Sequence, residues 1–151
     1  MPNLVPLKDE DYPAIIELTR DSMGPILREA LDLEFNEELF REMLADTDTT
    51  TLVMRDGPAV IGYVAFYPAE DQMFINWLVV HPSHRNRGFA SMLLDEAGRA
   101  AAQRGMRGLR ICLQENNRPA IALCEAAGFQ RVSLQPMGWI MEKTVVPERG
   151  D

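Results

Sequence analysis

The spacing of hydrophobic and polar residues alternates between helical and strand-like along the chain. In the first third, apolar residues recur at helical spacing in two segments. Asp9 or Asp11 can cap the first helix, and Asn36 can cap the second. We expect Gly24 and Pro25 to end the first helix, because proline lacks the amide hydrogen that a continuing helix needs.

Segments rich in β-branched and aromatic residues make up much of the remaining chain. Residues 89–104 interrupt them with a helical pattern, and Asn117 and Pro119 open a shorter helix that Gly128 ends. The order β-α-α-β-β-β-α-β-α-β-β combines hairpins with crossovers, so the predicted fold class is α+β, a mixed and mainly antiparallel sheet flanked by helices. The predicted strands are residues 5–7, 49–55, 59–68, 73–80, 109–114, 129–135 and 139–146.

Length and composition limit the class of protein. A chain of 151 residues, 46% hydrophobic and 25% charged, is expected to form a single globular domain over residues 1–151. No apolar run reaches the ~18 residues of a membrane span, and the N-terminus has an acidic cluster where a signal peptide is apolar. We therefore expect a cytoplasmic protein. Two cysteines, Cys112 and Cys124, and two histidines lack metal-site spacing, so no metal is expected.

The net charge of −8 is unevenly distributed. Residues 1–48 hold 13 acidic and 4 basic side chains, whereas residues 49–151 hold 10 acidic and 11 basic ones. Nucleic acid and anionic membranes are therefore poor partners. Two interpretations of the acidic third stay open, namely solvated helix faces or an acidic rim that attracts a cationic substrate.

One segment, VVHPSHRNRGFASMLL at residues 79–94, combines features that bind phosphate. A strand leads into a basic loop, and a helix begins where the loop ends. The helix N-terminus exposes unpaired amide hydrogens, Gly88 lets a phosphate approach the backbone, and Arg85 and Arg87 supply guanidinium groups. The segment predicts a pyrophosphate site, with an ordinary basic helix cap as the alternative. A single glycine excludes a Walker A loop and a dinucleotide fingerprint.

The loop sequence RNRGFA at residues 85–90 resembles the Q/R-x-x-G-x-G/A signature of the GCN5-related N-acetyltransferases, the GNAT family. About 30 residues downstream, NRPAIALCEAAGF at residues 117–129 is similar to the family's N-x-x-A-x-x-L-Y-x-x-x-G-F segment. Two motifs together are more specific than either alone. The resemblance covers essentially the whole chain. It implies a sheet with splayed central strands, acetyl-CoA as co-substrate and a primary amine as acceptor.

The resemblance also assigns roles to individual residues. It places the acetyl-pantetheine arm beside Leu78, Val79 and Val80, with the backbone amide near Val80 as donor to the thioester oxyanion. It implies that Asn117 hydrogen-bonds near the pantetheine, a role compatible with capping a helix. The residues that it assigns to the pyrophosphate are Arg85, Asn86, Arg87, Gly88, Phe89 and Ala90.

Two positions depart from the family's pattern. The tyrosine that often protonates the departing thiolate corresponds to Cys124, and the glutamate of many members corresponds to Asn76. A cysteine on a helix is more often a buried apolar residue, so we expect Cys124 to serve packing. Tyr63 and Tyr67 on the neighbouring strand are alternative acids, for which packing is again the competing role.

The predicted function is transfer of an acetyl group from acetyl-CoA to a primary amine by direct attack in a ternary complex. The alternative is a domain of the same fold that binds acyl-CoA without catalysis. The acceptor, a small-molecule or peptide amine that can be polycationic, is expected between residues 20–40 and 133–139. A homodimer is left open. Candidate walls of the acceptor pocket are Met23, Leu27, Leu31, Phe35, Gln135 and Trp139.

Overall fold

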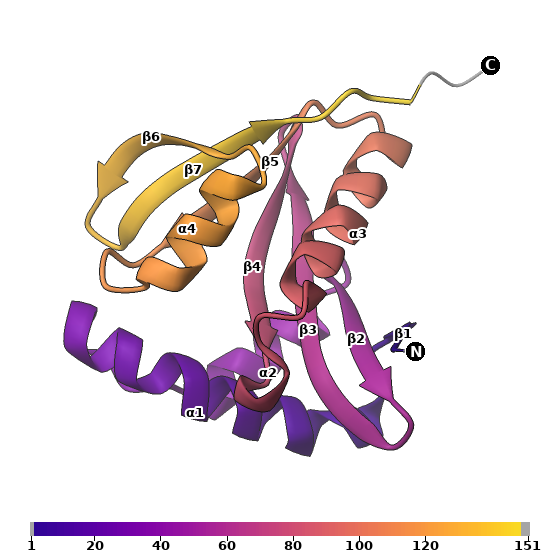
Figure 1. Ribbon diagram of the computed structural model, residues 1–151, viewed down its shortest axis with the longest axis vertical. Helices are drawn as coiled ribbons and strands as arrows, with labels where there is room; N and C mark the ends of the chain where they lie inside the picture. Colours follow the sequence, from indigo (N-terminus) through magenta and orange to yellow (C-terminus); the bar gives the residue numbers. More distant parts are fainter. Residues whose placement is uncertain (1, 149–151) are drawn as a thin grey trace.

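The computed structural model describes residues 2–148, and its elements follow the predicted order (Figure 1). One sheet has the strand order β1-β2-β3-β4-β5-β7-β6, in which β4 and β5 run parallel and the other pairs are antiparallel. The predicted fold class is therefore confirmed. The strands are β1 (Asn3–Pro6), β2 (Thr50–Asp56), β3 (Ala59–Ala69), β4 (Gln72–Val80), β5 (Gly108–Leu113), β6 (Gln130–Gln135) and β7 (Gly138–Thr144). The helices are α1 (Tyr12–Leu31), α2 (Glu37–Ala45), α3 (Phe89–Gln103) and α4 (Arg118–Ala126).

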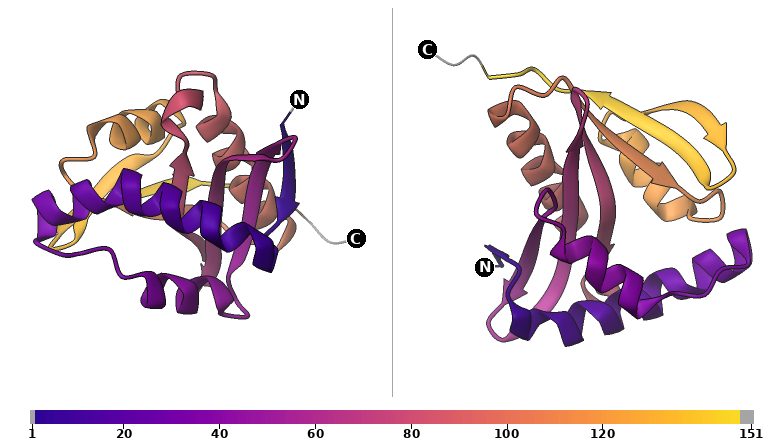
Figure 2. Two further views of the ribbon diagram at one scale, coloured as in Figure 1. Left: turned by 90° about the horizontal axis from the view of Figure 1, so that it is seen from below. Right: turned by 180° about the vertical axis from the view of Figure 1, so that it is seen from behind.

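The helices cover the two faces of the sheet in separate pairs, as Figure 2 shows from below. On one face, α1 and α2 bury Ile15 and Phe40 against Tyr63 of β3. On the other face, α3 and α4 contribute Leu93 and Cys124 to a larger buried cluster. Each face of the sheet thus has its own core, because successive side chains of a strand point to opposite faces.

The first helix is longer than predicted. It continues through Gly24 and Pro25 and ends at Leu31, followed by the C-cap Asp32, whose left-handed backbone has φ 54°. The prediction that Gly24 and Pro25 end the helix is therefore wrong. A proline inside a helix costs about 3 kcal/mol, but contacts beyond it stabilise the last turns. Ile26 is half-buried there, and the side-chain amide of Asn116 donates to the Ile26 carbonyl oxygen at 3.2 Å.

The parallel strands β4 and β5 separate halfway along their length. They pair from Gln72 opposite Gly108 to Ile75 opposite Ile111, and β4 then continues to Val80 without a β5 partner. The register of β4 against β3 shifts at Asn76, directly after the last pair with β5. A bulge of this kind bends a strand and increases its twist. The two halves of the sheet consequently diverge (Figure 1).

Candidate active site

A cavity of about 620 Å³ lies where β4 leaves β5. Its walls come from the end of β4, the loop before α3, the loop before α4 with the start of that helix, and the middle of α1. The structure thus brings together the two motifs found in the sequence. Arg87 is exposed and is not among the lining residues. The residues predicted for the donor that do line the cavity are Leu78, Val79, Val80, Arg85, Asn86, Gly88, Phe89, Ala90 and Asn117.

The edge of β4 that faces the cavity carries free backbone groups. The amide of His81 donates to the Ile61 carbonyl oxygen of β3 at 2.8 Å. Because backbone groups alternate in direction along a strand, the N–H groups of Val80 and Leu78 point away from β3. The β5 strand has already separated at this level, so these groups face the opening. This edge can pair with a ligand that carries amide groups.

The N-terminus of α3 forms a second wall. Gly88 precedes the helix with φ +81°, and a Cβ at this position would meet no residue beyond its chain neighbours within 4 Å. Among residues 2–148, no side chain caps this end, and the helical hydrogen bonds begin with the amide of Met92 donating to the Gly88 carbonyl. The amides of Phe89, Ala90 and Ser91 therefore lack helical partners. Such an end, with the positive pole of the helix dipole, suits an anion.

Arg85 connects this loop to the strand and to α1. Its Nε–H donates to the Val80 carbonyl oxygen at 3.2 Å, and Nη2 donates to Ser22 Oγ at 3.4 Å. The guanidinium is thus held at the cavity wall by one backbone and one side-chain partner. Its charge lies on the same loop as the free amides of α3, which adds to the attraction for an anion.

Several lining residues were not predicted from the sequence. Ser22 and Ile26 of α1 fall in the range 20–40 expected to frame the acceptor, but the sequence did not single them out; they lie four residues apart and therefore on one face of the helix. Asn116 adjoins the predicted Asn117, and its contact with α1 depends on the tertiary fold. The remaining unpredicted lining residues are His84, Ser91, Pro119, Ala120, Ala122 and Leu123.

Cys124 lies outside the cavity lining and inside the larger core. Its side chain is fully buried, and this burial raises the pKa of the thiol to about 11. Leu123, its neighbour on α4, lines the cavity instead. This placement supports the packing role expected for the cysteine, while proton transfer by Cys124 stays an untested prediction.

Tyr63 is also fully buried, beneath α1. Thr19 Oγ donates to the Ile15 carbonyl oxygen at 2.6 Å, so the Tyr63 hydroxyl donates to Thr19 Oγ across 2.5 Å. Burial raises the pKa of this phenol far above its usual value, with the hydrogen bond to Thr19 acting in the opposite direction. These contacts favour packing over acid catalysis.

Asn76 and Tyr67 lie below the cavity, toward the paired part of the sheet. Asn76 is half-buried at the bulge. Tyr67 stacks on Phe74 with ring centroids 5.4 Å apart, at a level where β4 and β5 are still paired. Neither residue lines the cavity, so a catalytic role for Asn76 remains a prediction.

The residues expected to line the acceptor pocket lie in several different environments. Met23 lines the cavity, and Phe35 packs on Phe40 with centroids 5.4 Å apart. Trp139 lies under the Arg131 guanidinium, 5.2 Å from its ring centroid, and packs against the larger core. Leu27 and Leu31 are half-buried on α1, and the side-chain amide of Gln135 donates to Ser133 Oγ at 3.1 Å.

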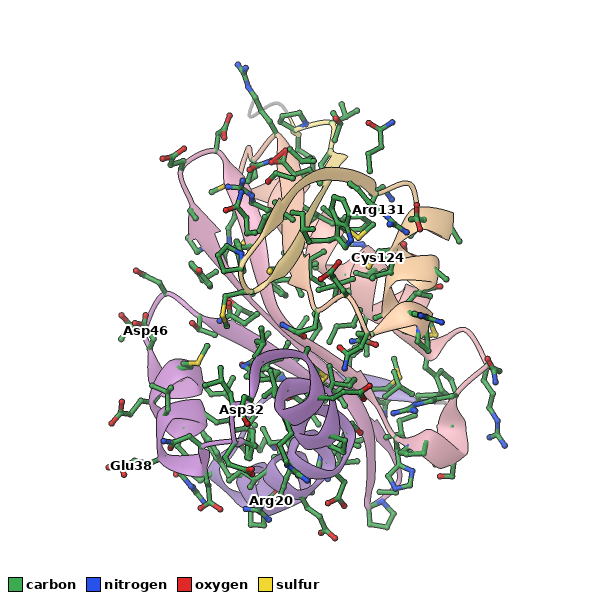
Figure 3. All side chains as sticks on the ribbon, turned by 90° about the vertical axis from the view of Figure 1, so that its left-hand side faces the viewer. Arg20, Asp32, Glu38, Asp46, Cys124 and Arg131 are labelled. Atoms are coloured by element: carbon green, nitrogen blue, oxygen red, sulfur yellow. The ribbon has the colours of Figure 1, made fainter. Side chains whose placement is uncertain are left out.

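Four carboxylates between the end of α1 and the first turn of α2 fall into two groups. Glu34 pairs with Arg28 at 3.3 Å, and Glu37 pairs with both Arg20 and Arg41 at 2.9 and 3.3 Å. The described residues provide no ion pair for Asp32 or Glu38, which are exposed. Figure 3 shows Asp32 on the lower half of the molecule, with Cys124 and Arg131 on the upper half.

Comparison with known proteins identifies the family. Residues 12–129 match the acetyltransferase (GNAT) family, and the chain belongs to it. It is 27% identical to YhfO of Bacillus subtilis (strain 168), an uncharacterized N-acetyltransferase, over 85% of this chain and 89% of YhfO. The family predicted from the sequence is thereby confirmed, and the protein is an acetyl-CoA-dependent N-acetyltransferase.

Solved structures agree on the fold. The PaiA N-acetyltransferase of Thermoplasma acidophilum, in complex with coenzyme A, superposes with a TM-score of 0.82 at 18% identity, over 95% of this chain and 99% of that one. The ribosomal-protein-S18-alanine N-acetyltransferase of Escherichia coli superposes with a TM-score of 0.77 at 18% identity, over 99% of this chain and 97% of that one.

Within residues 2–148, no three His, Cys, Asp or Glu side chains gather as a metal site requires. None of the helices between Tyr12 and Ala126 combines the length and apolar character needed to cross a membrane.

Proposed function

We propose that the protein transfers the acetyl group of acetyl-CoA to a primary amine by direct attack within a ternary complex. The observation that supports this reaction is the cavity between β4 and β5, where a free strand edge meets an uncapped helix N-terminus. The first can bind an amide-containing arm, and the second can bind a pyrophosphate. Acetyl-CoA carries both groups in one molecule.

In this proposal the donor lies along β4. The pantetheine amides pair with the backbone of Leu78 and Val80, and Asn117 hydrogen-bonds to the same arm. The pyrophosphate binds at the free amides of α3 and at Arg85, with Arg87 approaching from outside the cavity. A substrate held at several points in one geometry reacts faster, because its translational and rotational entropy has already been lost on binding.

The acceptor enters as a free amine. Its nitrogen attacks the thioester carbon, a C–N bond forms, and the carbonyl electron pair moves to oxygen. The N–H of Val80 then donates to this oxyanion, a type of contact often worth ~10²–10³ in kcat. When the carbonyl re-forms, the C–S bond breaks, CoA leaves as the thiolate, and the amine proton passes to solvent.

This reaction needs no dedicated acid or base. A positioned acid or base contributes about 10²–10⁴-fold, so an enzyme without one retains the rate due to positioning and oxyanion stabilisation. The buried thiol of Cys124 and the buried phenol of Tyr63 both lie away from the cavity. Water is the proton carrier in this scheme.

The acceptor is a small-molecule or peptide amine. The negative net charge of residues 1–48 supports an acceptor with more than one positive charge. A cytoplasmic location belongs to the same proposal, and a homodimer stays open.

A steady-state screen of amines with acetyl-CoA, in which released thiol is measured, tests the reaction. We expect thiol release that depends on both the amine and acetyl-CoA. The panel should include simple alkylamines, polyamines, amino-acid amides and basic peptides. Tight binding of CoA without turnover of any amine would instead support the non-catalytic alternative.

A further inference from the structure

We propose that His84 is a ligand of the donor's phosphates and that it takes up a proton when the donor binds. The inference rests on the proposed function for the position of the pyrophosphate. It concerns a residue that neither motif in the sequence includes.

His84 lies beside the proposed phosphate site. It is the last residue of a short 3-10 turn, η2 (Pro82–His84), and it is half-buried and lines the cavity. Its ring centroid is 6.3 Å from that of Phe89, the first residue of α3. Arg85 follows it directly in the chain. His84 therefore lines the same cavity as Arg85 and the first residues of α3, the groups expected to hold the pyrophosphate.

A chain of hydrogen bonds determines which ring nitrogen carries the proton. The backbone amide of Ser83 donates to His81 Nδ1 at 3.1 Å, so this nitrogen is an acceptor. Ser83 Oγ lies 2.7 Å from the same nitrogen and must therefore donate its single proton to it. Ser83 Oγ lies 3.0 Å from His84 Nδ1 and, having used that proton, accepts from Nδ1–H.

With the hydrogen bonds in these directions, a neutral His84 carries its proton on Nδ1 and a lone pair on Nε2. The described residues provide no hydrogen-bond partner for Nε2. A phosphate oxygen accepts hydrogen bonds, so it cannot bind a lone pair. A rotated ring would break the bond to Ser83. A second proton on Nε2 keeps that bond and adds both a donor and a positive charge toward the phosphates.

The charges around His84 favour proton uptake by its imidazole when the donor is bound. Arg85 on the same loop and the N-terminus of α3 are both positive. His81 is 5.8 Å away between ring centroids and lines a separate cavity with Glu17 and Asp21 of α1. The walls from α1 and α4 contribute no charged side chain to the donor cavity. Donor phosphates bring negative charge among these groups and favour the imidazolium.

Calorimetry can count the protons. The probe is dephospho-CoA, which lacks the 3′-phosphate and so has no phosphomonoester that titrates near pH 6. Titrations near pH 7 in buffers of different ionisation enthalpy give the number of protons taken up. We expect a substantial fraction of one proton for the wild type and close to none for His84→Gln, which keeps a neutral N–H donor. Wild-type affinity should weaken with rising pH by up to ~10-fold per unit, and that of the variant should change less.

His81→Asn is the matched control, because its Oδ1 takes the position of Nδ1 and can accept the same bonds from Ser83. This variant should take up protons as the wild type does. Equal uptake by the wild type and His84→Gln would overturn the inference. Equal loss of uptake in both single variants would also overturn it, since the proton would then not belong to His84.

Nitrogen-15 spectra of the imidazoles test the wild type directly, because the chain has two histidines. In the free protein we expect the Nδ1–H form for His84 and the Nε2–H form for His81. Saturation with dephospho-CoA should convert His84 to the imidazolium. A His84 that stays neutral in the saturated complex overturns the inference alone, whereas a wild type that binds neither CoA nor dephospho-CoA overturns the proposed donor site with it.

Discussion

The Nε–H of Arg85 donates to the carbonyl oxygen of Val80 at 3.2 Å. This bond joins the loop proposed to hold the pyrophosphate to the strand edge proposed to hold the thioester. The second contact of Arg85, to Ser22 at 3.4 Å, reaches α1. The arginine therefore links two parts of the donor site and also supplies charge.

Replacing Arg85 should weaken donor binding in a graded way. We expect Arg85→Gln to raise the Kd for CoA about 10- to 100-fold, because a hydrogen bond to a charged group contributes about 1.5–3 kcal/mol. Arg85→Lys should be intermediate, since it keeps the charge and loses the Nε–H contact to Val80. Ser22→Ala is the control and should stay within about threefold. Calorimetric Kd values that are equal for all four proteins would contradict the role of Arg85.

CoA binding should depend more on the charge than on the size of a side chain introduced at position 88. Gly88→Glu is expected to abolish measurable CoA binding, because it adds a negative charge where the helix N-terminus attracts an anion. Gly88→Ala is the matched control. A Cβ would meet no residue beyond its chain neighbours within 4 Å, so its cost is the left-handed backbone at φ +81°. That cost is on the order of 1 kcal/mol.

Calorimetry gives the CoA affinity of the two Gly88 variants, and circular dichroism checks that they are folded. The alanine variant should bind with at most ~10-fold weaker affinity. A folded Gly88→Glu protein with wild-type affinity would show that this loop is an ordinary helix cap.

Cys124 should matter for stability more than for turnover. Its thiol is buried with a pKa raised to about 11, so it is protonated throughout the neutral range. Cys124→Ala and Cys124→Ser should each lower kcat less than ~10-fold, below the usual contribution of a general acid. Thermal unfolding should show Ser as the more destabilising change, because it buries a hydroxyl in an apolar cluster. A hundredfold loss of kcat in both variants, at unchanged CoA affinity, would make the thiol the proton donor.

Tyr63 is expected to be structural. Tyr63→Phe removes the hydrogen bond to Thr19 and should lower the free energy of unfolding by about 1 kcal/mol. Its kcat should stay within about threefold of the wild type, because the hydroxyl points to α1 and lies away from the cavity. Tyr67→Phe, at the half-buried stack with Phe74, is the comparison variant. A hundredfold loss of kcat for either variant, with unfolding unchanged, would identify that tyrosine as the acid.

Much of the fold follows from local sequence signals. The cap predicted at Asn36 is present, with the Leu39 amide donating to Asn36 Oδ1 at 3.0 Å. The order of helices and strands was also predicted, because hydrophobic periodicity is a local property. The continuation of α1 through Pro25 was not predicted, because it depends on contacts made by Ile26 and Asn116 after folding. Propensity is a weak guide where such contacts oppose it.

The sequence predicts those residues of the site that lie in its motifs. Val80 and Gly88 lie in one continuous segment whose residue types indicate their chemistry. His84 lies in the same segment, but its role depends on the direction of the hydrogen bonds through Ser83, which the sequence does not reveal. Ser22 contributes only because α1 lies against the cavity.

The acidic N-terminal third gives the last prediction. If these charges attract the acceptor, kcat/KM for a dicationic amine should fall as salt rises, while kcat at saturation changes little. Salt acts on the approach of the amine, because the Debye length is about 8 Å at physiological ionic strength. A neutral amine of similar size should show a flat profile. Steady-state kinetics over a range of salt concentrations provide the measurement.

The structure indicates which carboxylates to change. Asp32 and Glu38 are exposed without an ion pair among the described residues, whereas Glu37 contacts two arginines. The double variant Asp32→Asn with Glu38→Gln should therefore weaken the salt dependence without disturbing the contacts of α1 with α2. Asp56→Asn with Asp95→Asn is the matched control, since it changes the net charge equally at the β2–β3 turn and on α3. Equal effects of the two double variants would mean that only the total charge matters. A flat salt profile for the dicationic amine in the wild type would mean that the acidic side chains merely solvate the helices.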